Sequence, residues 1–121
     1  MGFDVTIKHT DGQPLGEIAE VQRTLAEVFP GIVLFKSPSG PEKLQRAAEQ
    51  GVQFPEFLRQ QIEATLPEYE GVFETSGFSA EFHLGSSETV ETVDVVLHGD
   101  MGSAEATFAT LGRYGWIVTH P

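Results

Sequence analysis

An alternation of apolar and polar residues in the second half of the chain, interrupted only at Val96, constrains its fold more than any other feature. Every second residue from Phe78 to Leu84 is apolar, and every second residue from Val93 to Leu97 is apolar again. A period of two is typical of a β-strand with one buried and one solvent-exposed face. The turn-forming segment Gly85-Ser86-Ser87-Glu88 lies between the two runs. We therefore predict an antiparallel pair of strands here.

Weaker signals predict the remaining elements. Residues 3–8 alternate like the runs above, and apolar residues recur at intervals of three and four from Ile18 to Phe29, which indicates a helix. The continuous apolar run 32–35 indicates a strand that is covered on both faces. The other predicted elements are helices ending near Gln50 and Leu66, strands at 72–73 and 116–118, and a helix between Gly99 and Gly115.

Together these elements follow the order β-α-β-α-α-β-β-β-α-β. Two β-α-β crossovers on either side of a meander indicate an α+β fold with a mixed, mainly antiparallel sheet and its helices on one face. A ferredoxin-like sandwich with a helical insertion fits this order. No linker or internal repeat divides the chain, so we expect residues 1–121 to form a single domain.

Composition excludes several classes of protein and site. The chain has no cysteine, which rules out disulfides, thiolate zinc sites and cysteine nucleophiles. No apolar stretch approaches the roughly 18 residues of a membrane-spanning helix, and residues 1–10 lack the basic and apolar regions of a secretory signal. We expect a cytoplasmic protein without a membrane segment.

The net charge of −11 is distributed unevenly. Residues 1–59 are nearly balanced, whereas residues 60–112 contain ten acidic residues and neither lysine nor arginine. A chain with so few bases has no basic patch that could offset repulsion from phosphates. Nucleic acid and anionic membrane surfaces are therefore excluded as partners.

Three explanations of this acidity remain open. It can serve solubility alone. It can instead reflect adaptation to high salt, although fourteen of the eighteen acidic residues are glutamate and proteins of halophilic organisms tend to be rich in aspartate. It can also form an acidic surface for a basic protein partner. On the third explanation, the predicted contact residues are Glu70, Glu74, Glu81, Glu88, Glu91 and Asp94.

Histidines and carboxylates form the second candidate site. A register that pairs Leu84 with Val93 would place His83 opposite Asp94, with Cβ atoms about 5 Å apart. His98 and Glu81 would share that face, and the set could hold a proton or a metal ion. The competing interpretation is that a solvent-exposed sheet face of any acidic protein places histidines near carboxylates.

No catalytic motif accompanies these residues. The chain lacks an H-E-x-x-H helix and a G-x-S-x-G nucleophile elbow. The segment 97–103 links a strand to a helix, where nucleotide-binding proteins hold phosphate, but it lacks their glycine pattern and lysine. There we expect a tight turn, with Ser103 capping the helix. We assign no catalytic residue and no cofactor, and a binding protein is favoured over an enzyme.

One resemblance bears on function. The segment from Val93 to Val118, an apolar strand ending in Gly99, a short helix, and then Gly115-Trp116 and a strand, resembles the end of small uncharacterised bacterial α+β proteins. Some of these resemble immunity proteins of toxin systems. The resemblance covers about a fifth of the chain and transfers no functional residue, but it implies a binding role. A further alternative is an assembly module, either monomer or homodimer, that pairs through its last strand.

Overall fold

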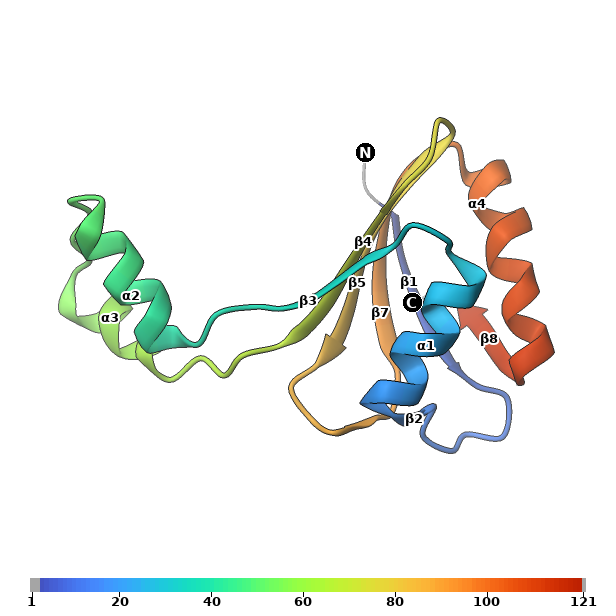
Figure 1. The fold of residues 1–121 in the computed structure, drawn as a ribbon, viewed down its shortest axis with the longest axis horizontal. Coiled ribbons are helices and arrows are strands. Elements are labelled where there is room, and N and C mark those ends of the chain that lie inside the picture. The colour runs from blue at the N-terminus through green and yellow to red at the C-terminus, as the bar shows by residue number, and fades with distance from the viewer. Residues whose placement is uncertain (1–2, 121) are drawn as a thin grey trace.

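The computed structural model describes residues 3–120 and shows a six-stranded sheet in the order β3-β4-β5-β7-β1-β8 (Figure 1). Its strands are β1 (Phe3–His9), β3 (Val33–Lys36), β4 (Tyr69–Glu74), β5 (Phe78–Gly85), β7 (Val93–Gly99) and β8 (Trp116–Thr119). A separate two-stranded ribbon joins β2 (Gly16–Glu17) to β6 (Thr89–Val90). The helices are α1 (Ile18–Val28), α2 (Gly40–Glu49), α3 (Glu56–Glu63), α4 (Met101–Phe108) and the 3₁₀ helix η1 (Ala109–Tyr114).

The predicted α+β class and the mainly antiparallel sheet are confirmed. The ten predicted elements occur in the predicted order, with β2, β6 and η1 in addition. The mixed sheet is wrong, because every strand pairing among the described residues is antiparallel. Each crossover does return a parallel strand, but other strands lie between the two: β1 separates β7 from β8, and three strands separate β1 from β3.

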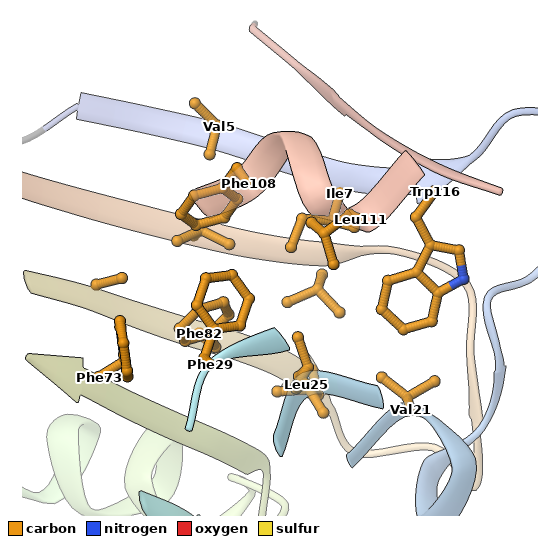
Figure 2. Packing of buried hydrophobic residues seen from close by; sticks show 14 of the residues in the cluster. Val5, Ile7, Val21, Leu25, Phe29, Phe73, Phe82, Phe108, Leu111 and Trp116 are labelled. Carbon is orange, nitrogen blue, oxygen red and sulfur yellow. The ribbon is translucent and has the colours of Figure 1, made fainter. Parts of the chain in front are cut away.

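The core lies between the sheet and the helices α1 and α4, which cover the same face (Figure 1). Phe29, which follows α1, is fully buried at the centre of an aromatic cluster. Its ring centroid lies 5.3 Å from that of Phe73, 5.1 Å from that of Phe82 and 4.9 Å from that of Phe108 (Figure 2). Tilted and edge-on ring pairs at these distances stabilise a core beyond the apolar area they bury.

Strand β3 corrects the expectation of a strand covered on both faces. It is the outermost strand of the sheet, and Val33 and Phe35 are 62% and 42% exposed. Leu34 alone of its central residues points toward the core, opposite Gly71. A short apolar run cannot by itself distinguish a central strand from an edge strand, because both have the same local pattern.

Helices α2 and α3 pack on each other and project away from the sheet (Figure 1). We call residues 40–63 the helical arm. No residue of the arm belongs to the core cluster, and Phe57 is 65% exposed. The two helices approach closely because Gly40 has no side chain: a Cβ there would collide with the carbonyl of Ile62. The expectation that the helices share one face is thus correct for α1 and α4 and wrong for the arm.

The predicted tight turn between β7 and α4 depends on Gly99. Gly99 has a φ of +107°, which favours glycine, and a Cβ there would lie 2.7 Å from the carbonyl oxygen of Gly77. The predicted cap, Ser103, is wrong, because α4 begins at Met101 and Asp100 is the N-cap. The Asp100 carboxylate accepts hydrogen bonds from the backbone N–H of Gly102 and from the Ser103 hydroxyl, at 2.9 and 3.0 Å.

Within residues 3–120, no helix has both the length and the apolar character that crossing a membrane requires.

Candidate functional site

The face of the sheet opposite α1 and α4 is covered by no helix of the described chain (Figure 1). We call it the open face. Its side chains come from the strand positions that alternate with the core positions, since successive side chains of a strand point to opposite faces. The open-face residues are Asp4, Thr6, Lys8, Val33, Phe35, Glu70, Val72, Glu74, Ser79, Glu81, His83, Asp94, Val96, His98, Ile117 and Thr119.

Strand register arranges these residues in rows across the sheet. One row runs through Glu70, His83, Asp94 and Thr6, each directly opposite the next. The next row runs through Val33, Val72, Glu81, Val96 and Asp4. Val72 and Val96 are half-buried and lie on either side of Glu81 in this row. The open face therefore interleaves apolar side chains with carboxylates.

Its charge is strongly one-sided. Five carboxylates belong to it, and among the described residues Lys8 is its only lysine or arginine. Lys36, on the edge strand β3, instead lies over the ring of Tyr69, with Nζ 5.1 Å from the ring centroid. A basic ligand that approaches this face meets little repulsion.

The structure places the six predicted contact residues in different parts of the molecule. Four lie on the open face: Glu70, Glu74, Glu81 and Asp94. Glu91 lines a shallow hollow of about 480 Å³ beside them, which His83 and Asp94 also line. Glu88 differs, because its carboxylate accepts a hydrogen bond from the hydroxyl of Tyr69, which packs against the core on the other side of the sheet.

The predicted opposition of His83 and Asp94 is confirmed by the register of β5 and β7. Their side chains nevertheless have other partners. His83 Nδ1 lies 3.3 Å from Glu70 Oε1, and Asp94 Oδ1 accepts a 3.1 Å hydrogen bond from the Thr6 hydroxyl. His98 lies opposite Ser79, four residues along β7, so it does not join the other two.

A different trio brings its ligand atoms together. One oxygen each from Glu68 and Glu70 and one nitrogen from His83 all lie within 4.8 Å of one another. Sequence reasoning missed Glu68 in this role, although its spacing of two from Glu70 is a usable signal. The β4–β5 register that sets Glu70 opposite His83 was not available from the sequence, since the two residues are thirteen apart and a bulge lies between Tyr69 and Glu70.

Comparisons of the chain with protein-family models, with curated proteins and with solved structures give no match.

Proposed function

We propose that this chain is a non-enzymatic binding protein of the cytoplasm that presents its open face to a basic protein partner, as an inhibitor of the immunity type does. The observation that carries the proposal is the concentration of five carboxylates around Val72 and Val96 on a face that no helix of the described chain covers. A protein–protein interface usually contains both apolar area and polar or charged side chains.

The carboxylates and the apolar side chains of the open face have separate roles in this proposal. Carboxylates attract a basic partner over about a Debye length and exclude acidic ones, which sets the association rate and the specificity. The half-buried valines and the exposed Val33 and Phe35 supply apolar area that a partner removes from water. The resemblance of residues 93–118 to immunity-like proteins supports the same assignment.

Two charge-reversal variants test the proposal. Glu74→Lys/Glu81→Lys places two bases on the open face, and Glu49→Lys/Glu56→Lys places two bases on the helical arm. All four residues are exposed, and both variants change the net charge from −11 to −7. Each variant and the unchanged chain are used to capture proteins from a lysate of the source cell, and the affinity for the captured protein is then measured at 50 and 500 mM salt.

We expect the unchanged chain and the arm variant to retain the same basic protein, and the open-face variant to bind it at least about tenfold more weakly. Affinity for the unchanged chain should fall steeply with salt. Equal losses in both variants would show that total charge matters rather than the face. An association rate that is independent of salt would also contradict the proposal.

A second candidate function is metal or small-ligand binding at His83. The convergence of Glu68, Glu70 and His83 favours it, because carboxylate oxygens and imidazole nitrogen are ligands for Zn²⁺ and Mn²⁺. Titration with Zn²⁺ should shift the His83 ring resonances and leave those of His98 unchanged. No shift below millimolar Zn²⁺, or equal shifts at both rings, would remove this candidate.

The third alternative, an assembly module, depends on β8. This strand forms one edge of the sheet and is paired on one side only, by β1. Sedimentation at two concentrations distinguishes a monomer from a homodimer that pairs along this edge.

At the level of fold, we propose that β8, β1, β7 and β5 with α1 and α4 form a ferredoxin-like sandwich, to which β3, β4 and the helical arm are added. The order of these four strands and the two crossovers support it.

A further inference from the structure

A second recess lies on the helix-covered side of the sheet, away from the open face. It has a volume of about 480 Å³ and is bounded by α4 and η1 on one side and by β1, β7 and β8 on the other. Small residues account for the space: Ala104, Ala109 and Gly112 form part of the helical wall, and none has a side chain long enough to fill it. We call it the apolar cavity.

The lining of this cavity is suited to an apolar molecule. Val5 and Leu97 of the sheet, Phe108 of α4 and Trp116 of β8 contribute buried side chains. Ligand sites of this volume are typically concave and apolar with few polar groups at the rim. The exposed rings of Phe3 and His120, with centroids 5.1 Å apart, form part of its border. A flat aromatic body can therefore be enclosed on several sides.

The charge around the cavity determines which polar group on such a molecule would be favoured. Among the described residues, Glu105 is the one carboxylate that lines it, and no lysine or arginine does. The residues of α4 and η1 that line the cavity all precede Arg113 and belong to the stretch from Gln60 to Gly112, which has no lysine or arginine. An anionic head would be repelled, whereas an ammonium group would gain both the carboxylate and the faces of nearby aromatic rings.

We propose that the apolar cavity binds a small molecule with an aromatic body and a cationic amine head. This site is independent of the proposed partner surface, because the cavity and the open face lie on opposite sides of the sheet. The rings of Phe108 and Trp116 hold the body, and Glu105 at the rim holds the head.

The chain carries its own reporter for this site, since Trp116 is its single tryptophan and lines the cavity. Three probes with the same body, 4-phenylbutylamine, 4-phenylbutanol and 4-phenylbutyrate, are titrated at about pH 8.5, where amine and carboxylate are charged and imidazole side chains are ordinarily neutral. We expect saturable changes in Trp116 fluorescence. The amine should bind about two- to fivefold more tightly than the alcohol, and the acid more weakly than either.

Two substitutions on α4 and η1 locate the binding. Ala109→Phe adds a large side chain at the cavity, whereas Ala106→Phe adds the same side chain at an exposed position that does not line it. We expect the first to abolish the titration and the second to preserve it. Glu105→Gln should remove the preference for the amine over the alcohol while leaving the alcohol's affinity unchanged.

The proposal is overturned if none of the three probes gives a saturable change in the unchanged chain. Equal effects of Ala109→Phe and Ala106→Phe would place any binding elsewhere. Binding of the acid as tight as that of the amine, or an amine preference that survives Glu105→Gln, would overturn the assignment of a cationic head.

Discussion

The two faces of the main sheet are built by the same strands but have opposite chemistry. On β5, Phe78, Ala80 and Phe82 are at most 5% exposed beneath α1 and α4, while Glu81 between them points to the other side and is exposed. Successive side chains of a strand point in opposite directions, so a single segment supplies both a core and a charged surface. The comparison shows that four of the ten acidic residues of 60–112 gather on one face because antiparallel register aligns the polar positions of β4, β5 and β7.

The largest change in stability is expected when two neighbouring residues of β7, one on each face, are substituted. Val95 is 1% exposed on the covered face, and Val96 is half-buried on the open face. Val95→Lys should cost more than about 4 kcal/mol and unfold much of the protein, because it buries an unpaired charge. Val96→Lys should cost no more than about 1 kcal/mol, since its ammonium reaches water. Urea unfolding, monitored by circular dichroism, measures the free energy of unfolding of both variants. Similar losses of stability would mean that the two faces are not distinct.

A smaller effect is expected at the turn that brings α4 back over the covered face. Gly99→Ala should lower the free energy of unfolding by about 1–3 kcal/mol, because its φ is positive and the added methyl meets the carbonyl of Gly77. Gly112→Ala is the matched control, with no positive φ and no atom within 4 Å of the added Cβ, and should change it by less than about 0.5 kcal/mol. Equal effects would show that the turn does not constrain the helix.

The smallest effect is expected from a hydrogen bond at the surface that joins η1 to α1. The Tyr114 hydroxyl donates a 2.9 Å hydrogen bond to Glu27 of α1, and this bond raises the pKa of Tyr114 above its ordinary value of 10.0. Glu27→Ala should lower that pKa toward 10.0, whereas Glu20→Ala on the same helix should leave it unchanged. Two-dimensional NMR of the Tyr114 ring against pH measures the shift.

The sign of the linked stability follows from the direction of this shift. A pKa that is higher in the folded chain than in the unfolded chain means that the bond stabilises the fold below the ordinary tyrosine pKa, and that this contribution disappears as pH rises through the folded-state value. The unchanged chain and Glu27→Ala should therefore differ in stability at neutral pH and converge at high pH. A difference that grows with pH would contradict the link.

Local patterns predicted much of the fold and part of the candidate site. The alternation over 78–84 and 93–97 correctly assigned the core positions of β5 and β7, and the register it implied set His83 opposite Asp94. Prediction from local patterns failed where a contact or the position of a strand depended on residues distant in the sequence. The Glu70–His83 contact required the pairing of β4 with β5, and the edge position of β3 required the order of the whole sheet.

The sequence by itself determined which side of each central strand is apolar and where acidic residues accumulate, because strand alternation and composition are local properties. Tertiary structure alone decided that one sheet face has no helical cover, that α2 and α3 leave the body as an arm, and that small residues leave a cavity beneath α4. These features depend on which distant segments pack together, and long-range packing is governed by side-chain shape and strand order rather than by the period of any single segment.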